Sequence, residues 1–554
     1  MAVESSPTVQ AAEYDRPAQF PQQSRSVVVA KNGIVATSHP LAAQAGLDVL
    51  KAGGNAVDAA IATAASMTVV EPVSNGLGSD AFCLLWDGTS LHGLNASGHA
   101  PQAWTPGYFA HKHGSDARTP PMRGWDSVTV PGAVAGWVAM SERFGKLPFA
   151  DLMQPAIEIA ERGYAVPVVV QQKWAAAVPL LAQQPGFAEA FMPHGRAPNV
   201  GELFKLPGAA RSLRLIAQSK GAAYYRGEIA QAAAQHARAH GGAITAEDFA
   251  AYRPEWVAPI GMGYAGGAGQ YRLHEIPPNG QGIAALMALG ILKNFDLAAM
   301  KVDGIDSQHL QIEAMKLAFA DVYRFVAEPA SMEVSVDQML DPGYLAARAK
   351  LIDLRRAQDF GAGDPARGGT IYLTAADESG MMVSFIQSNY MGFGSGVVVP
   401  GYGLSMQNRG HGFSLAAGSA NLVAPGKRPF HTIIPAFLTK DGQAQMSFGV
   451  MGGNMQPQGH LQTLVRMLDY AQQPQAACDA PRWRFNQGRE INVEASMDAA
   501  TVTGLQARGH QVEVINDSYQ DFGAGQFIWR LGDPASEGYV AASDARRDGQ
   551  AVAF

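Results

Sequence analysis

The chain has 554 residues, of which 47% are hydrophobic, and it carries a formal net charge of −7 at pH 7. This much apolar material can build a large core, and the mild acidity argues against a nucleic-acid or anionic-membrane partner. Its two cysteines, Cys83 and Cys478, exclude a disulfide framework and a thiolate metal cluster. We expect two buried thiols, with a single bridge as the alternative.

The first 25 residues are polar and contain no basic cap followed by an apolar run. We therefore expect no secretory signal and a cytoplasmic protein. The apolar stretch Ala59–Val70 is shorter than the roughly 18 residues that a membrane span needs, so no membrane contact is expected. No Ser/Gly/Pro-rich linker or block of charge divides the chain, which favours one structural domain.

Two helices are predicted near the start of the chain. Pro40 is placed for the first turn of an Ala/Leu-rich helix that Gly53 and Gly54 end. Asn55 can cap a second helix over Ala56–Val70, and this helix is apolar on nearly every side. A helix without a polar face is expected to be buried.

Strand and helix signals alternate further along, as in layered α/β proteins. Phe82–Trp86 is predicted to be a strand closed by a turn, whereas Gly261–Gly266 matches G-x-G-x-x-G without opening a helix. A strand or turn is expected there rather than a nucleotide site. Helices are predicted over Asp306–Glu328 and Leu340–Asp359, followed by an exposed, turn-rich segment from Gly361 to Gly369.

Thr370 follows this segment directly and opens a β-like run to Ala376. Two glycines, Gly368 and Gly369, precede it, as at a point where a chain can be cut to leave Thr370 as a new N-terminus. An N-terminal threonine carries a hydroxyl nucleophile and an α-amine that can act as its base. A plain structural turn before a strand is the alternative.

The motifs around Thr370 resemble those of the γ-glutamyltranspeptidase family of N-terminal-nucleophile hydrolases, and the resemblance covers most of the chain. Counting the Thr370 segment, ten matches follow in the family's order; the other nine are Lys51–Ala60, Val70–Gly78, Val130–Gly136, Gln154–Ile157, Tyr225–Ala230, Gly241–Asp248, Glu313–Asp321, Gly449–Gly453 and Ala542–Asp548. The resemblance implies a four-layer αββα sandwich with two antiparallel sheets between helical layers. It also implies a large subunit, residues 1–369, and a small subunit, residues 370–554.

The same resemblance assigns the catalytic residues. Thr370 falls on the family's nucleophile, and Thr374 and Ser388 fall on hydroxyl positions near it. Gly452 and Gly453 fall on the glycines whose N–H groups hold the oxyanion. Two adjacent donors without side chains can reach a tetrahedral oxygen, and one such donor is worth roughly 3–4 kcal/mol. A simple β-turn is the alternative for the glycine pair.

The substrate pocket departs from the family pattern. Ser97 occupies the position of the family's carboxylate-binding arginine, Gly412 that of the ammonium-binding aspartate, and His431-Thr432 that of a serine pair. Tyr390 replaces an asparagine, and Arg409 or Arg428 could bind a carboxylate instead. The alternatives are a solvated Arg409 and a packed core His431.

These segments resemble a branch that includes oxamate amidohydrolase of purine breakdown and enzymes like cephalosporin acylase. The expected function is hydrolysis of a small carboxylate-bearing amide, oxamate first, by an α/β heterodimer formed on self-cleavage, with a dimer of heterodimers also open. Alternatives are γ-glutamyl hydrolysis or transfer on glutathione-like donors, a cephalosporin or glutaryl acylase, and an unprocessed binding scaffold. No cofactor and no metal are expected.

Overall fold

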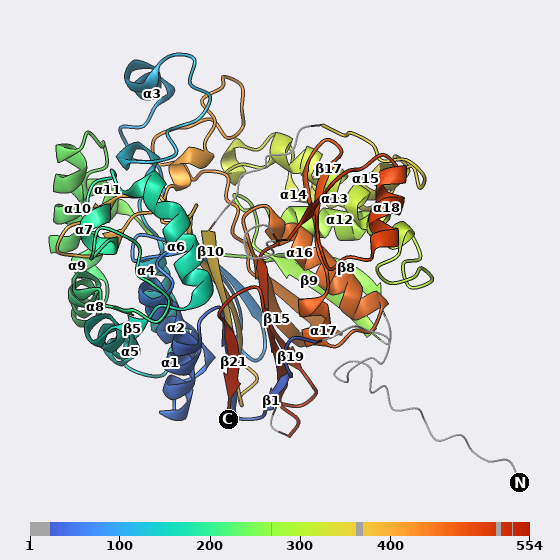
Figure 1. Cartoon of the computed structure of the whole chain (residues 1–554), viewed down its shortest axis with the longest axis horizontal. Helices are drawn as coiled ribbons and strands as arrows, with labels where there is room; N and C mark the ends of the chain where they lie inside the picture. Colours follow the sequence, from blue (N-terminus) through green and yellow to red (C-terminus); the bar gives the residue numbers. More distant parts are fainter. Residues whose placement is uncertain (1–22, 267–268, 362–368, 517–521, 535) are drawn as a thin grey trace, which may run out of the picture.

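Two seven-stranded antiparallel sheets lie face to face at the centre of the molecule (Figure 1). The computed structural model describes residues 23–266, 269–361, 369–516, 522–534 and 536–554. In strand order, sheet I consists of β21 (Gln550–Ala553), β2 (Gly33–Thr37), β10 (Gly369–Asp377), β11 (Met382–Tyr390), β3 (Asp80–Trp86), β4 (Leu91–Ala96) and β7 (Glu255–Val257). Sheet II consists of β1 (Val28–Ala30), β20 (Tyr539–Ser543), β19 (Ala524–Arg530), β15 (Gln443–Met451), β14 (Ala436–Lys440), β9 (Gly269–Glu275) and β8 (Ile260–Gly266).

Side chains on both faces of β10 are buried, each face in a different core. Ile371, Leu373 and Ala375 point into a core shared with helices, whereas Tyr372 and Ala376 belong to the core between the two sheets. Successive strand residues point to opposite faces, so a strand covered on both sides is apolar at almost every position. The predicted run from Thr370 to Ala376 has this composition.

Helices cover the outer face of each sheet (Figure 1). The layer on sheet I is formed by α1 (Pro40–Lys51), α2 (Ala56–Val70), α4 (Ala133–Phe144), α5 (Phe149–Arg162), α6 (Val168–Leu181), α7 (Phe187–Phe191), α8 (Pro207–Ser219), α9 (Ala222–Tyr225), α10 (Glu228–Ala239) and α11 (Ala246–Ala251). The layer on sheet II is formed by α12 (Ile283–Leu292), α13 (Ile305–Phe325), α14 (Val336–Met339), α15 (Pro342–Ala349), α16 (Met455–Leu464), α17 (Pro474–Asp479) and α18 (Ala499–Ala507). The order helix, sheet, sheet, helix confirms the predicted four-layer sandwich.

The predicted helices and strands agree with the structure in most places. All residues of α2 are buried, and Asn55 and Asp58 form a reciprocal capping box at its start. Gly261–Gly266 lies within β8, as expected. The prediction of one helix over Leu340–Asp359 is wrong, because α15 begins at Pro342 and ends at Ala349. Most of the predicted turn-rich segment, residues 362–368, lies outside the described residues.

The two cysteines are free and buried, as the sequence predicted. Cys83 faces the core between sheet I and its helices, whereas Cys478 lies in the core on the far side of sheet II. Among the described residues, no helix combines the length and the apolar character that crossing a membrane would require.

Candidate active site

Thr370 lies near the start of β10, where the pairing with β11 is irregular. Gly369 pairs with Tyr390 and Ile371 with Gln387, so β11 carries one extra residue opposite Thr370. Such bulges redirect side chains and are frequent beside active sites. The Thr370 hydroxyl donates a hydrogen bond of 3.2 Å to Ser388 Oγ, and Thr370 is 2% exposed. The structure therefore brings two of the predicted hydroxyls together.

Ser388 connects Thr370 to Tyr390, because its Oγ accepts hydrogen bonds from both the Thr370 hydroxyl and the Tyr390 backbone N–H, the latter at 2.8 Å. Tyr390 has a positive φ of 75°, which is uncommon for a residue with a side chain. Strained backbone of this kind occurs at functional sites, where surrounding contacts must hold it in place.

Thr374 lies on the same face of β10 as Thr370 but further along the strand. Its hydroxyl is hydrogen bonded to Ser447 Oγ at 2.5 Å, and Ser447 belongs to β15 of sheet II. Four residues of extended strand span about 13 Å. Thr374 thus connects the two sheets, and its predicted role beside the nucleophile stays a prediction.

Gly452 and Gly453 form the turn between β15 and α16, with φ values of 126° and 62°. Gly453 is buried, and within the described part of the chain neither glycine N–H has a hydrogen-bond acceptor. Both glycines directly precede Asn454, the N-cap residue of α16, and the N-terminus of a helix favours a bound anion. The Gly453 carbonyl is held by Gln281 Nε2 at 3.0 Å. The arrangement has the free donors that an oxyanion site needs.

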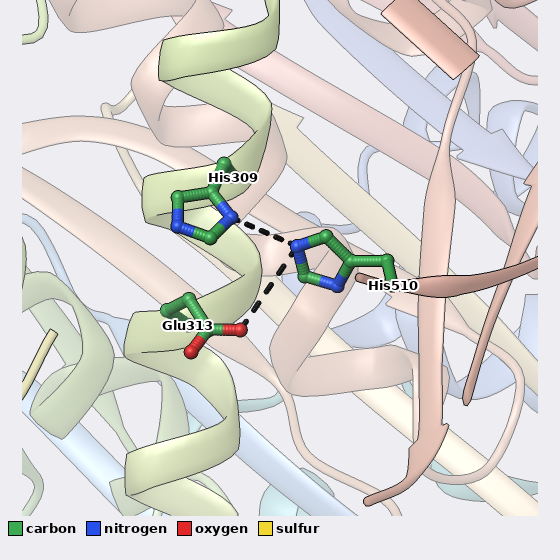
Figure 2. A group of neighbouring side chains, drawn as sticks. All are labelled: His309, Glu313 and His510. Atoms are coloured by element: carbon green, nitrogen blue, oxygen red, sulfur yellow. Dashed lines mark hydrogen bonds and ion pairs between the residues drawn. The ribbon is translucent and has the colours of Figure 1, made fainter. Parts of the chain in front are cut away.

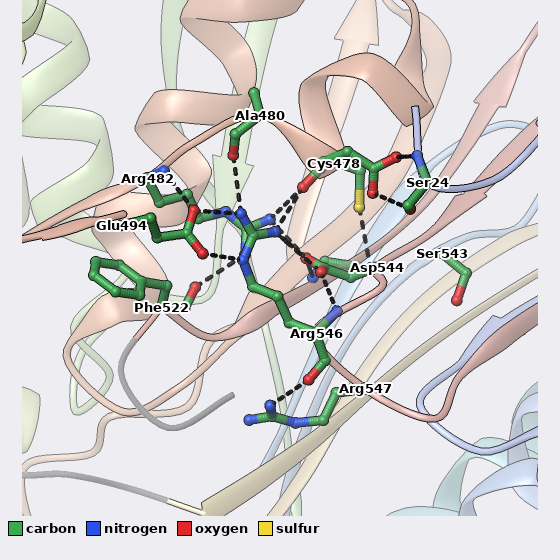
Figure 3. Close-up of polar contacts among 12 residues, drawn as sticks. Ser24, Cys478, Ala480, Arg482, Glu494, Phe522, Ser543, Asp544, Arg546 and Arg547 are labelled. Atoms are coloured by element: carbon green, nitrogen blue, oxygen red, sulfur yellow. Dashed lines mark hydrogen bonds and ion pairs between the residues drawn. The ribbon is translucent and has the colours of Figure 1, made fainter. Parts of the chain in front are cut away.

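A buried ion-pair network supports the chain next to these glycines (Figure 3). A Cβ on Gly452 would lie 3.0 Å from Gly523 Cα, so the two segments are in close contact. Two residues further on, the Gly525 N–H donates to Asp544 Oδ2 at 2.8 Å, and Arg482 Nη2 reaches the same oxygen at 2.8 Å. Arg546 pairs with Asp544 and Glu494. Burial raises the pKa of Asp544, but the Arg546 and Arg482 charges outweigh this effect and hold it below its usual range.

Replacing Asp544 with asparagine is expected to destabilise the protein by about 3 kcal/mol, because it leaves buried arginine charge without its partner. A carboxyl group whose pKa is lowered by folding stabilises the protein above its unfolded-state pKa and loses that effect as the pH falls. The gap between the thermal midpoints of wild type and variant should therefore narrow as the pH drops below about 4. Thermal unfolding from pH 7 to pH 3 measures the gap. Asp306→Asn, at an exposed ion pair, is the control and should change the midpoint little.

Arg409 is the buried cation of the site. It lies in a short 3₁₀ helix, Arg409–Gly412, with 1% exposure, which excludes the solvated alternative. Its Nη1 donates to Thr432 Oγ1 at 2.8 Å, and its Cζ lies 4.6 Å from the centroid of the Tyr390 ring. Its Nε and Nη2 are buried and have no partner among the described residues. Two unpaired N–H groups of one guanidinium form a fork that matches a carboxylate.

His431 is fully buried, and its Nε2 lies 3.1 Å from Asp80 Oδ2. The Ile433 N–H donates to His431 Nδ1 at 3.4 Å, so Nε2 carries the proton and donates to Asp80. Burial, and next the Arg409 charge, hold the pKa of His431 well below its usual value. The ring is therefore neutral and presents a fixed donor.

Asp80 is the residue that the sequence-based reasoning missed. It is the first residue of β3 and pairs in register with Ser388. Burial raises the pKa of its carboxyl group to about 7, although the Arg409 guanidinium acts in the opposite direction. The available signal was a lone charge at the start of an otherwise apolar strand, since buried aspartates are rare unless they are paired.

The other predicted pocket residues are already occupied by protein contacts. Ser97 Oγ donates to Asn95 Oδ1 at 2.7 Å, and Arg428 Nη1 pairs with Glu255 at 2.6 Å. The Gly412 carbonyl accepts a hydrogen bond from Asn421. Of the two candidate arginines, Arg409 is the one with two buried, unpaired nitrogens, Nε and Nη2, whereas at Arg428 only Nε is in this state among the described residues.

A second buried cluster, His309, Glu313 and His510, has the residue types of a metal site (Figure 2). His309 Nε2 donates to the Asp353 carbonyl at 2.9 Å, so its Nδ1 accepts the His510 Nε2–H at 2.8 Å. Lys316 Nζ contacts Glu313 Oε1 at 2.7 Å. A divalent ion would have to displace both the His510 proton and this ammonium group. The cluster instead holds residues 353–358, since Lys316 also binds the Gln358 carbonyl and Glu313 accepts the Gln358 N–H.

The gamma-glutamyltranspeptidase family model matches residues 42–554 of the chain. The chain is 35% identical over 538 residues to the glutathione hydrolase-like YwrD proenzyme of Bacillus subtilis, which covers 96% of this chain and 99% of that protein. It is also 35% identical over 540 residues to the oxamate amidohydrolase proenzyme of Klebsiella pneumoniae, with 95% and 99% covered. The crystal structure of cephalosporin acylase from Bacillus halodurans superposes with a TM-score of 0.90 at 49% identity, over 97% of this chain and 99% of that one.

Proposed function

The chain belongs to the gamma-glutamyltranspeptidase family of N-terminal-nucleophile hydrolases, and we propose that it cleaves itself before Thr370 and then hydrolyses a carboxylate-bearing amide, oxamate foremost. The observation that carries the proposal is the connection of the Thr370–Ser388 hydroxyl pair to Arg409 through Tyr390. Ser388 and Tyr390 thus connect the nucleophile to a guanidinium with two buried nitrogens that have no partner among the described residues.

In the proposed maturation step, Thr370 Oγ attacks the Gly369 carbonyl carbon and the acyl group moves from nitrogen to oxygen. Water then hydrolyses the ester, which leaves Gly369 as a carboxylate and frees the Thr370 α-amine. The products are a large subunit, residues 1–369, and a small subunit, residues 370–554, which stay together as a heterodimer. The buried cluster in Figure 2 supports this, because His510 of the small subunit bonds His309 of the large one.

In the proposed turnover, the α-amine takes the proton from Thr370 Oγ as the oxygen attacks the substrate carbonyl carbon. Its reference pKa of about 7.7–8.0 is close enough to neutral pH for a base. The N–H groups of Gly452 and Gly453 stabilise the oxyanion, and the protonated amine gives its proton to the leaving nitrogen. Water, activated by the same amine, hydrolyses the ester. Oxamate yields oxalate and ammonia.

Arg409 selects the acyl group in this proposal. Leaving its two free N–H groups unsatisfied in the interior is costly, and a substrate carboxylate satisfies both at once. The Tyr390 ring against the guanidinium keeps the fork in position. Thr432 Oγ1 accepts a hydrogen bond from Arg409 Nη1, and the adjacent His431 is bonded to Asp80, whereas Ser97 is bonded to Asn95.

A second candidate, hydrolysis of a larger carboxylate-bearing side chain, is favoured by the 49% identity to the cephalosporin acylase structure. Both candidates place a carboxylate on Arg409 and differ in the length of the acyl group. The γ-glutamyl alternative needs an additional carboxylate to bind the substrate ammonium group. Asp80 is the candidate for this role, but both of its oxygens already accept protein hydrogen bonds.

A substrate panel on the purified, cleaved protein tests the proposal. Ammonia release from oxamate, and amine release from glutaryl and γ-glutamyl anilides, are compared by kcat/KM. We expect oxamate to exceed the γ-glutamyl anilide by at least about tenfold, a difference of 1.4 kcal/mol. A preference for the glutaryl anilide would select the second candidate. A preference for the γ-glutamyl anilide would contradict the pocket assignment.

A further inference from the structure

Asp80 has no role in the hydrolysis proposed above, yet it lies at the centre of the site. Its carboxyl group is fully buried, it is paired in register with Ser388, and Ser388 contacts the nucleophile. Oδ2 accepts the His431 Nε2–H at 3.1 Å, and Oδ1 accepts the Gly132 N–H at 3.3 Å. Asp80 is thus held rigidly by protein contacts, so its own role concerns charge rather than direct binding.

Asp80 and a bound ligand would have to share one cation, Arg409. Arg409 donates to Thr432, and the adjacent His431 donates to Asp80. The Arg409 guanidinium is the positive charge that acts most strongly on Asp80. His431 is neutral, and Arg428 acts more weakly because it is engaged with Glu255. Among the described residues, the phenols of Tyr224, Tyr225 and Tyr252 also act on Asp80; burial raises their pKa, so they are neutral, and their hydroxyls donate to backbone carbonyls.

An anionic acyl group that binds Arg409 therefore creates a conflict. Arg409, an ionised Asp80 and a ligand carboxylate together carry one net negative charge among buried side chains. A buried charge without a partner costs several kcal/mol, and a like charge nearby favours protonation of a carboxylate. One proton on Asp80 removes the conflict and leaves the ligand carboxylate paired with Arg409.

We infer that Asp80 is a specificity-determining residue of this pocket: it takes up a proton when an anionic acyl group binds Arg409, so the site accepts a single negative charge. The inference rests on the proposed function in one respect only, that Arg409 receives a carboxylate. The proton comes from solvent and stays on the Asp80 carboxyl group. The pocket therefore binds a ligand with one carboxylate. A second buried carboxylate would have no cation to pair with.

The inference predicts a pH dependence with a definite sign. In the free protein, burial raises the pKa of Asp80 to about 7, and a bound carboxylate raises it further. Anion binding is therefore strongest below about pH 7, where Asp80 is already protonated. It weakens as the pH rises, because Asp80 must then take up a proton from a solution that contains fewer protons. The Thr370 α-amine titrates in a similar range, so the experiment has to separate the two groups.

The test is calorimetric titration of the cleaved wild-type protein with pyruvate, which has the shape and charge of oxamate without its amide nitrogen. Titrations at pH 8 in two buffers of different ionisation enthalpy give the number of protons taken up. We expect most of one proton per pyruvate, and a Kd that rises more than about tenfold between pH 6.5 and pH 8.5. Asp80→Asn keeps the shape of the side chain, and it should bind pyruvate without proton uptake and with little pH dependence.

Three results would overturn the inference. Pyruvate binding to the wild type without proton uptake would do so even if Asp80→Asn failed to fold. Uptake that persists in a folded, cleaved Asp80→Asn would assign the proton to the Thr370 amine. Tighter binding of L-alanine, which replaces the keto group of pyruvate with an ammonium group, would show that ionised Asp80 receives a cation. None of these measurements needs turnover, so proton uptake without oxamate hydrolysis would refute the proposed substrate alone.

Discussion

Thr370→Ala is expected to remain a single uncleaved chain with no measurable amide hydrolysis. The substitution removes the only hydroxyl that can attack the Gly369 carbonyl from the adjacent residue, and without cleavage there is no free α-amine to act as base. A loss of at least about 10⁴-fold in kcat is expected, because nucleophile and base disappear together. A denaturing gel and an ammonia assay of the variant measure these two consequences, and N-terminal sequencing of the smaller wild-type fragment identifies the cleavage point.

Thr370→Ser is the matched control for this prediction. Serine keeps the hydroxyl and its hydrogen bond to Ser388 but lacks the methyl group that restricts the rotamer. We expect it to cleave more slowly and to keep part of the activity. An active wild-type protein that stays in one piece, or a small fragment that begins at another residue, would contradict the proposed nucleophile.

The fold could be predicted from the sequence because its signals are local and repeated. Asn55 caps the helix as predicted, and the helix that follows is buried on every side, as its nearly all-apolar composition led us to expect. The β-like run predicted from Thr370 to Ala376 corresponds to strand β10, which covers Gly369–Asp377. The helix predicted over Leu340–Asp359 failed because residues beyond Ala349 are held by tertiary contacts: Gln358 is bonded to Glu313 and Lys316 of α13. Helical composition alone does not reveal such contacts.

The candidate site could be predicted only in part. Thr370 and Ser388 are 18 residues apart in sequence, and the structure brings the two hydroxyls into contact on neighbouring strands. Their catalytic roles, assigned from the family resemblance, stay a prediction. The burial of Arg409 was not predictable, since it depends on Tyr390 and Thr432 from two other segments. Asp80 was missed because its partner His431 lies 351 residues away. Electrostatic pairs at such separation leave no periodic pattern in the sequence.

Arg409→Ala is expected to raise the KM for oxamate by about 100-fold or more while self-cleavage continues. Removing one partner of a buried, hydrogen-bonded charge pair costs about 2–5 kcal/mol, and about 2.7 kcal/mol corresponds to a factor of 100. Maturation involves the Gly369 carbonyl and the Thr370 hydroxyl, and within the described part of the chain neither group is hydrogen bonded to Arg409. Steady-state kinetics with oxamate and a gel of the purified variant check the two halves of the prediction.

Two further variants separate the loss of a binding group from the loss of packing. Arg409→Lys keeps the charge and most of the side-chain volume but cannot present two parallel N–H groups, so its KM should also rise, though less. Arg428→Ala removes an arginine that is already paired with Glu255 and should leave the KM within about threefold of wild type. Equal effects at positions 409 and 428, or an unchanged KM in Arg409→Ala, would contradict the assignment. The distinction matters because the sequence gives no reason to prefer either arginine, whereas in the structure Arg409 is the more buried of the two and has two adjacent unpaired nitrogens.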